Sequence, residues 1–208
     1  MKKIVLATHN QGKIAEFERL LGDHASDISV LGLRDFPDLP DVEETGSTLE
    51  ENALLKSRAV AAFTGLPALA DDSGLFVNAL GGDPGVFSAR WAGEHGNDLA
   101  NIEKVLRQMC ELAEKDPNLD RSAAFRCVIA LSFPDGHPRG GEDVIEMGEM
   151  PGSLIEEARG DKGFGYDPIF IPEGLLLTSA ELEADEKDAR SHRGRAMRAI
   201  APRLIDLL

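Results

Sequence analysis

Two adjacent carboxylates, Asp71 and Asp72, follow a short apolar run at residues 66–70 and precede Ser73 and Gly74. A run of this kind is typical of a buried strand, and we expect the strand to end at the carboxylates. Neighbouring strand residues point to opposite faces, but a chain that turns there could bring both side chains to one site. Carboxylate oxygens suit Mg²⁺, which binds one or two of them together with water and phosphate. The alternative is an Asx-turn whose carboxylates only cap a helix.

A polar loop with a lysine follows the first apolar run of the chain, at residues 4–7. Its sequence is Thr8-His9-Asn10-Gln11-Gly12-Lys13. A helical pattern begins at Lys13, so backbone N–H groups and an ammonium would face an anion at the helix N-terminus. The glycine spacing is not that of a Walker loop. The residues indicate either a phosphate site or an ordinary helix cap with a solvated lysine.

Two acids and a lysine accompany the next helical pattern, which Thr48 and Glu51 are expected to cap. Glu43 and Glu44 precede it and are either solvated loop acids or a source of a second carboxylate for the same metal. Lys56 lies inside the helix, where its long side chain either faces water or extends to a phosphate.

An aromatic segment between glycines, Gly163-Phe164-Gly165-Tyr166-Asp167, stands out in a chain with one Tyr and one Trp. An aromatic ring there can present its face to a base, and glycines allow a close approach of the backbone. Asp167 either accepts hydrogen bonds from a base or holds the loop in shape. The alternative is a tight turn anchored by buried aromatic side chains.

A cation, a neutral donor and a guanidinium precede the last helical pattern: Lys187, His192 and Arg193, with Ser191 as the expected N-cap. Such groups can recognise a purine carbonyl and bind phosphate. The alternative is a capped helix start with exposed charges.

The elements that must position these residues alternate between strand and helix patterns. Strands are expected at 4–7, 66–70, 123–133, 144–150 and 168–171, and helices from 13, over 48–63, around 102–112 and after 191, the last bent by Pro202. The order indicates an α/β fold with a mixed sheet flanked by helices. A length of 208 residues favours a single domain over residues 1–208.

Composition excludes several functions. The net charge is −15, from 37 acidic and 22 basic residues, which argues against a general nucleic-acid binder. A small anion would need a local cationic site or a metal ion. Cys110 and Cys127 lack metal-ligand spacing and are expected to be buried free thiols. No apolar run is long enough for a signal peptide core or a membrane span, so we expect a cytoplasmic protein with no membrane partner.

Taken together and in order, these segments resemble the inosine triphosphate pyrophosphatase family, also called XTP/dITP diphosphatases, over nearly the whole chain. The matching motifs are Thr8-His9-Asn10 with Gly12-Lys13, Glu43-Glu44-Thr45-Gly46, Glu51-Asn52-Ala53 through Lys56, Ala70-Asp71-Asp72-Ser73-Gly74-Leu75, Leu80-Gly81-Gly82 through Pro84-Gly85, Ser88-Ala89-Arg90, Gly163-Phe164-Gly165-Tyr166-Asp167-Pro168 and Ser191-His192-Arg193. The joint pattern is far more specific than any single member.

The resemblance implies an elongated two-lobed fold with a long central sheet, a substrate cleft between the lobes and a homodimer. It implies Asp72 as the catalytic carboxylate, and Asp72 with Glu44 as ligands of Mg²⁺. It assigns substrate contacts to Thr8, His9, Asn10, Gln11, Gly12, Lys13, Lys56, Ser73, Phe164, Gly165, Tyr166, Asp167, Lys187, His192 and Arg193.

The implied reaction is hydrolysis of ITP, dITP or XTP to the monophosphate and pyrophosphate, which keeps these nucleotides out of DNA and RNA. We expect water to attack the α-phosphorus, activated by Asp72 directly or through the metal. A carbonyl at the purine 6-position would be selected by donors such as His192.

Three alternatives remain: one is a related enzyme, and two belong to other functional classes. One is a Maf-like pyrophosphatase with a different base specificity. Another is a nucleotide-binding regulator without catalysis, which has no need of Asp72, Glu44 and Lys13 together. The third is an RNA-binding module, which the net charge of −15 opposes.

Overall fold

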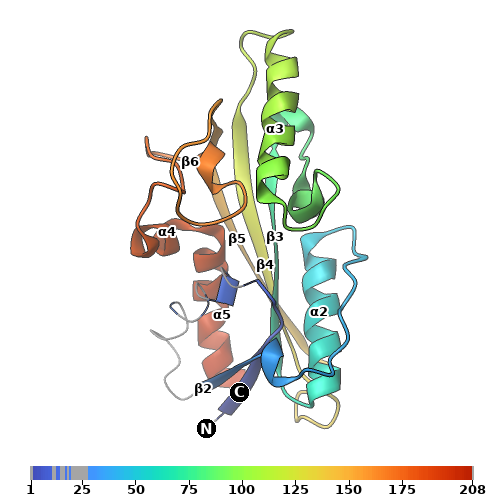
Figure 1. The fold of residues 1–208 in the computed structure, drawn as a ribbon. Helices are drawn as coiled ribbons and strands as arrows, with labels where there is room; N and C mark the ends of the chain where they lie inside the picture. The colour runs from blue at the N-terminus through green and yellow to red at the C-terminus, as the bar shows by residue number, and fades with distance from the viewer. Residues whose placement is uncertain (1, 11–12, 15–16, 18, 20–27, 208) are drawn as a thin grey trace. The chain divides into compact units, whose positions relative to one another are not determined.

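A computed structural model of the chain describes residues 2–10, 13–14, 17, 19 and 28–207 (Figure 1). Its strands are β1 (Lys2–Leu6), β2 (Ile28–Gly32), β3 (Ala68–Val77), β4 (Ser122–Ser132), β5 (Asp143–Leu154) and β6 (Phe170–Pro172). They form one sheet in the order β2-β1-β3-β4-β5-β6. β1 runs parallel to β2 and β3, whereas β5 and β6 are antiparallel, so the predicted mixed sheet is confirmed.

The described helices are α2 (Leu49–Thr64), α3 (Asp98–Ala113), α4 (Ala184–Arg190) and α5 (His192–Leu207). α2 begins as predicted, because the hydroxyl of Thr48 accepts a hydrogen bond from the Glu51 N–H at 3.1 Å. Pro202, which was expected to bend the last helix, lies inside α5. None of the helices in the described part of the chain is long and apolar enough to cross a bilayer.

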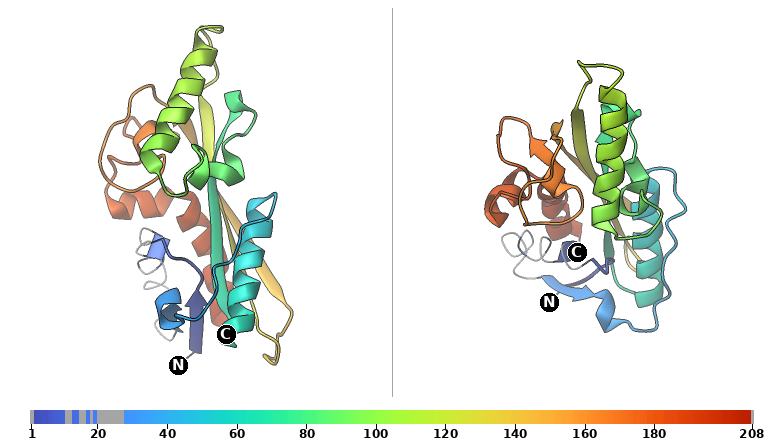
Figure 2. Two further views of the ribbon diagram at one scale, coloured as in Figure 1. Left: turned by 45° about the vertical axis from the view of Figure 1, so that its right-hand side comes forward. Right: turned by 45° about the horizontal axis from the view of Figure 1, so that its top comes forward.

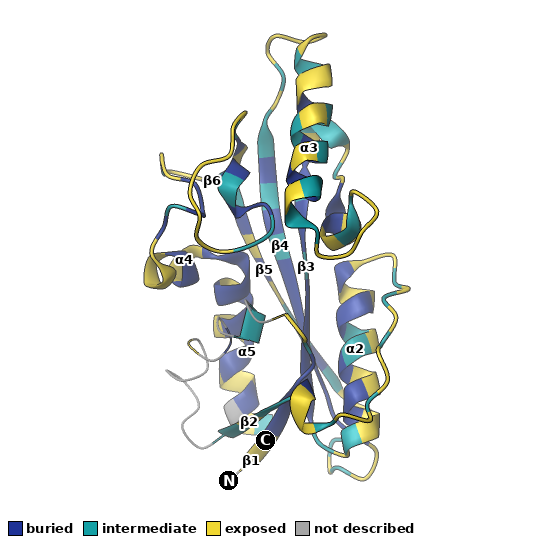
Figure 3. Cartoon of the chain, viewed as in Figure 1, coloured by how far each residue is buried: buried dark blue, intermediate teal, exposed yellow. Residues whose placement is uncertain are grey.

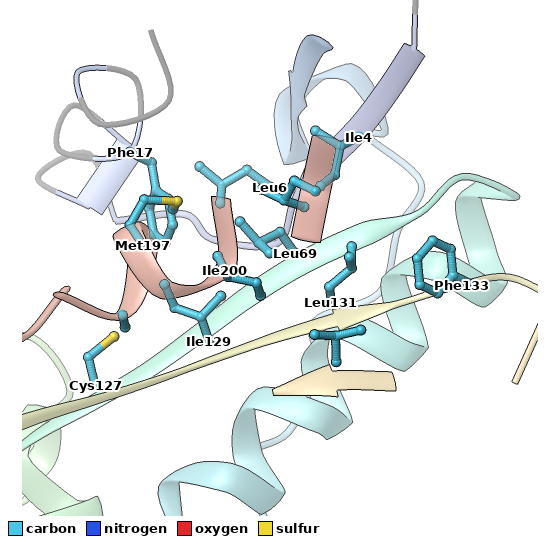
Figure 4. Packing of buried hydrophobic residues seen from close by; sticks show 13 residues of the cluster. Ile4, Leu6, Phe17, Leu69, Cys127, Ile129, Leu131, Phe133, Met197 and Ile200 are labelled. Carbon is cyan, nitrogen blue, oxygen red and sulfur yellow. The ribbon is translucent and has the colours of Figure 1, made fainter. Parts of the chain in front are cut away.

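The chain divides into two compact units, and the first comprises Met1–Asp72, Cys127–Gly148 and Arg193–Leu208. Within it, α2 and α5 lie on opposite faces of the sheet (Figures 1 and 2). Ile4, Leu6 and Leu69 pack with Met197 and Ile200 of α5 (Figure 4). The intervening strand residues Val5, Ala68 and Ala70 pack with Val60 and Ala61 of α2. This alternation places successive core residues of β1 and β3 under one helix or the other.

The second unit comprises Ser73–Arg126 and Glu149–His192. Its core joins Val105 and Met109 of α3 to Leu75 of β3 and Phe125 of β4. Along the strands of this unit, buried residues alternate with less buried ones, whereas α3 exposes one side (Figure 3). Asn97 caps α3 by accepting a hydrogen bond from the Ala100 N–H at 3.2 Å.

Several predicted elements differ from the structure. β3 does not end at the carboxylates but continues to Val77, because Ser73 and Gly74 fit an extended chain and no residue there breaks it. Residues 168–171 are a 3-10 turn, Asp167–Ile169, followed by β6 from Phe170. β2 and α4 were not predicted, and both are short.

Of the two cysteines predicted to be buried, one is exposed. Cys127 is buried, but Cys110 is exposed, because it lies on the solvent side of an amphipathic helix; both are free thiols. Lys13, Ile14 and Phe17 are helical, and the rest of the helix predicted after Lys13 falls largely outside the described residues. The predicted cleft between lobes and the single domain stay predictions.

Candidate active site

The two carboxylates of β3 point to opposite faces of the strand. Leu69 belongs to the core under α5, and Ala68 and Ala70 to the core under α2. Because side chains alternate along a strand, Asp71 follows Leu69 to the α5 face and Asp72 follows Ala70 to the α2 face. The continued strand therefore points the two carboxylates to different faces, and each has its own hydrogen-bond and ion-pair contacts.

Asp72 belongs to a polar cluster against α2. Its Oδ2 accepts a hydrogen bond from the Asn52 side-chain amide at 3.0 Å, and its Oδ1 lies 3.6 Å from Lys56 Nζ. The same ammonium lies 2.7 Å from Oε1 of Glu44. Lys56 is therefore not the solvated lysine of the alternative reading, because its ammonium contacts two carboxylates.

Burial shapes the acid–base properties of this cluster. It raises the pKa of Asp72 above its ordinary value, and the ammonium ions of Lys56 and Lys13 only partly offset the effect. Burial alone would lower the pKa of Lys56, but Asp72, Asp71 and Glu44 outweigh it and the pKa is raised. Asp72 is thus a stronger base than a solvated Asp, beside an ammonium that stays protonated.

Asp71 is the centre of a second cluster. Its Oδ2 lies 2.9 Å from Lys13 Nζ and 3.2 Å from Arg193 Nε. Burial alone would raise the pKa of Asp71, but the charges of Lys13, Arg193 and Lys56 hold it well below its usual range. Lys13 and Arg193 were predicted to contact substrate; in the structure both bind this one carboxylate.

The loop ahead of Lys13 forms the helix cap of the second interpretation, but its lysine is bound to Asp71 and not solvated. The N–H of Asn10 donates to the Thr8 hydroxyl at 3.2 Å, and the Asn10 side chain accepts from the Lys13 N–H at 3.2 Å, as a helix cap does. His9 is exposed, with its Nε2 3.7 Å from Asp41. Gln11 and Gly12 lie outside the described residues.

The aromatic segment lies in the second unit, where Asp167 holds it in shape. Oδ2 of Asp167 accepts from the Phe164 N–H at 3.0 Å and from Lys187 Nζ at 2.6 Å. The ammonium of Lys187 also lies 5.2 Å from the centroid of the half-buried Phe164 ring. Gly163 has φ +79°, and a Cβ there would collide with the Asp167 carboxylate and the Lys187 ammonium.

The other aromatic of the segment serves the core. Tyr166 is buried, and its hydroxyl donates to the Ser88 carbonyl at 2.9 Å. Burial, with the nearby charge of Asp98, raises the pKa of Tyr166. Gly165 donates its N–H to Asp98 at 2.7 Å, which fixes the loop to the start of α3. Only Phe164 of the two rings is therefore partly available to a ligand.

The site residues predicted at the start of the last helix are buried, and Ser73 is partly buried. His192 is buried and stacks on Phe125, with ring centroids 5.0 Å apart and planes at 11°. Ser191 is buried at the junction of α4 and α5, and Ser73 is half-buried on β3. The reading of exposed charges at 191–193 is therefore wrong, because these side chains are inside the fold.

The carboxylates of the first unit suit Mg²⁺. Glu44 and Asp72 present hard oxygen atoms, and both lie against one ammonium, so a positive charge is already favoured between them. No group of three His, Cys, Asp or Glu side chains in the described part of the chain could hold a metal. Mg²⁺ needs only one or two carboxylates when phosphate and water complete its shell, so the pair fits.

Asn52 is a buried member of the Asp72 cluster that the sequence analysis quoted within a motif but gave no role. It is fully buried, donates to Asp72 and accepts from the Gly46 N–H at 2.8 Å. A buried polar side chain on the core-facing side of α2 was the available signal, because such a group is retained only with partners.

Comparison with known proteins identifies relatives along the full length. A model of the Ham1 family matches residues 4–203. The dITP/XTP pyrophosphatase of Streptomyces avermitilis is 49% identical over 208 residues, which is 100% of both chains. The protein of the same name from Streptomyces coelicolor is 50% identical over the same coverage.

Solved structures agree with these matches. A HAM1 protein from Coxiella burnetii is 46% identical and superimposes with a TM-score of 0.85 over 99% of this chain and 100% of that one. The Ham1 protein of Staphylococcus aureus is 42% identical, with a TM-score of 0.83 over 100% of both chains.

Proposed function

Because the chain belongs to the Ham1 family, we propose that it hydrolyses non-standard purine nucleoside triphosphates, such as dITP and XTP, to the monophosphate and pyrophosphate. The observation that carries this proposal is the sequence identity of 49% and 50%, over the full length of both chains, to two enzymes named dITP/XTP pyrophosphatase. By removing such nucleotides, the enzyme would keep them out of DNA and RNA.

Ammonium groups of the first unit would bind the negatively charged triphosphate, although the protein as a whole is acidic. The net charge of −15 repels a triphosphate at long range, so binding depends on local positive charge. Lys13 and Lys56 supply two ammonium groups, each held by carboxylates. We assign Lys13, with Thr8 and Asn10 ahead of it, to the phosphates.

Glu44 and Asp72 are the residues that would hold Mg²⁺. When bound, Mg²⁺ neutralises phosphate charge and acts as a Lewis acid. Asp72 has its pKa raised by burial, which makes it a better acceptor for a proton from water. In the overall reaction, one water adds its oxygen to the α-phosphorus while the bond to the pyrophosphate oxygen breaks.

Selection of the base is assigned to the second unit. Phe164 offers a half-buried ring, and the backbone around Gly163 and Gly165 can approach a base closely. His192, held against Phe125, offers a donor to a carbonyl at the purine 6-position. A site built for that carbonyl leaves the amino group of adenine mismatched, which disfavours ATP. A homodimer and a cytoplasmic location remain expectations.

Product analysis tests the proposal. Purified protein with Mg²⁺ is incubated with ITP, dITP, XTP, ATP and GTP, and pyrophosphate and orthophosphate are assayed separately. We expect pyrophosphate from the first three substrates and little product from ATP or GTP. Orthophosphate would mean cleavage at the terminal phosphate and contradict the reaction. Turnover of pyrimidine triphosphates instead would favour the Maf-like alternative, and tight binding without product the regulator.

A further inference from the structure

Asn52 occupies a position where an apolar residue would be expected. It lies on α2 with 0% of its surface exposed, next to Ala53, which packs in the core. Asn is a poor helix former compared with Ala or Leu. A buried amide also costs free energy unless its donors and acceptor are satisfied. The contacts made by this side chain must therefore explain its presence.

One end of the Asn52 amide binds the proposed catalytic carboxylate, and the other binds the backbone of the loop that carries Glu44. The nitrogen Nδ2 donates to Oδ2 of Asp72 at 3.0 Å. The oxygen Oδ1 accepts from the N–H of Gly46 at 2.8 Å. Gly46 follows Glu44 by two residues, and a Cβ on it would lie 2.6 Å from Oδ1 of Asn52, so only glycine allows this approach.

We infer that Asn52 is a positioning residue that orients Asp72 and ties it to the loop carrying Glu44. This inference rests on the proposed function, because it takes Asp72 as the catalytic carboxylate. Asn52 does not touch the substrate in this account; it acts through the carboxylate that it holds.

The orientation matters because the terminal torsion of an Asp side chain is soft. A donor on Oδ2 selects one orientation, which leaves Oδ1 3.6 Å from Lys56 Nζ, the ammonium that also binds Glu44. Without that donor, Asp72 could rotate toward Lys56 and form a closer ion pair. A carboxylate held closely by an ammonium is a poorer proton acceptor and a poorer ligand.

Three variants test the inference by steady-state hydrolysis of dITP. Asn52→Ala removes both contacts. Asn52→Leu fills a similar volume but has neither the donor for Asp72 nor the acceptor for Gly46. Ser57→Ala is the matched control, because Ser57 is equally buried on α2 and bonds to Ser132 at 2.7 Å instead.

We expect kcat to fall roughly 10- to 100-fold in both Asn52 variants, the usual cost of losing a residue that orients a ligand. We expect KM to stay within about threefold of wild type, because the phosphate and base contacts are unchanged. Ser57→Ala should keep kcat within about twofold, although it also loses a buried hydrogen bond. A crystal structure of Asn52→Ala should show the Asp72 carboxylate turned toward Lys56.

Either of two results would overturn the inference. One is a kcat for either Asn52 variant equal to that of Ser57→Ala. The other is a crystal structure of Asn52→Ala in which the Asp72 carboxylate keeps its wild-type orientation. Thermal unfolding, and a fall in kcat without a rise in KM, separate a positioning defect from misfolding. Asn52→Leu carries the test if Asn52→Ala does not fold. Failure of wild type to release pyrophosphate would instead overturn the proposed function, and the inference with it.

Discussion

Arg193 and Asp71 form an ion pair inside the first unit, with Nε of Arg193 3.2 Å from Oδ2 of Asp71 and side-chain exposures of 2% and 0%. A guanidinium stays charged in proteins, so its burial requires a fixed counter-charge. The lowered pKa of Asp71 has the same origin. Because Asp71 also binds Lys13, the pair supports the proposed phosphate site from within the core.

Loss of one member of this pair is expected to destabilise the fold. Asp71→Asn keeps the shape but removes the carboxylate that Arg193 and Lys13 share, and breaking a buried ion pair typically costs about 3–5 kcal/mol of unfolding free energy. In Asp71→Asn/Arg193→Met the buried charge is also gone, so the double variant should lose less than the sum of the two single ones. Chemical denaturation of the four proteins measures this; simple additivity would show that the two groups do not stabilise each other.

Replacement of Asp72 is expected to act on chemistry and not on the fold. Asp72→Asn preserves shape but removes the proposed proton acceptor and metal ligand, so kcat should fall more than about 100-fold with Mg²⁺ present. Circular dichroism and thermal unfolding check that the variant is folded. Asp143→Asn is the control, because Asp143 is bound to Ser132 and Arg58, outside both clusters, and should keep wild-type kcat. Near-normal turnover by Asp72→Asn would remove its assigned role.

The local sequence pattern predicted the main elements but not the geometry of the carboxylates. The apolar run at 66–70 correctly indicated β3, and Thr48 correctly marked the start of α2. The predicted strand end at Asp71 was wrong, because polar residues usually mark turns, whereas here the partners of both carboxylates lie inside the fold. Local patterning carries no information about such distant counter-charges.

Some contacts of the site could not be predicted from the sequence, because their partners lie far apart along the chain. The contact between Asp71 and Arg193 joins residues 122 positions apart. Asn52 and Asp72 are 20 positions apart, and nothing in the spacing marks them as neighbours. Lys13 was predicted to bind phosphate, which stays a prediction, and its buried counter-charge followed only from the tertiary structure.

Substrate capture is expected to depend on Lys13. Lys13→Ala removes an ammonium proposed to bind phosphate, so kcat/KM for dITP should fall roughly 10- to 100-fold, the cost of a charge-assisted hydrogen bond. Lys162→Ala is the matched control, because Lys162 also forms an ion pair, with Glu183 at 2.6 Å, but is half exposed. An unchanged kcat/KM in Lys13→Ala would count against the phosphate contact.

The loop at Gly163 is expected to tolerate no side chain. Gly163→Ala meets the Asp167 carboxylate and the Lys187 ammonium in addition to the strain of φ +79°. Gly174→Ala has nearly the same φ, +80°, with open space around it, so it reports the backbone strain alone, about 1–2 kcal/mol. We expect only Gly163→Ala to raise KM for dITP. Equal KM values in the two variants would show that the Asp167–Lys187 pair has no role in binding the base.

Acid is expected to weaken the fold partly through Asp143. Burial alone would raise the pKa of this carboxylate, but hydrogen bonds from Arg58 and Ser132 outweigh it and the pKa is lowered. A group with a depressed folded-state pKa contributes stability above its unfolded value, about 3.9, and loses it as pH falls toward the folded pKa. The difference in unfolding free energy between wild type and Asp143→Asn should therefore be constant near neutral pH and shrink below about pH 4. Denaturant titrations across that range measure it, and a difference that grows on acidification would reverse the assigned sign.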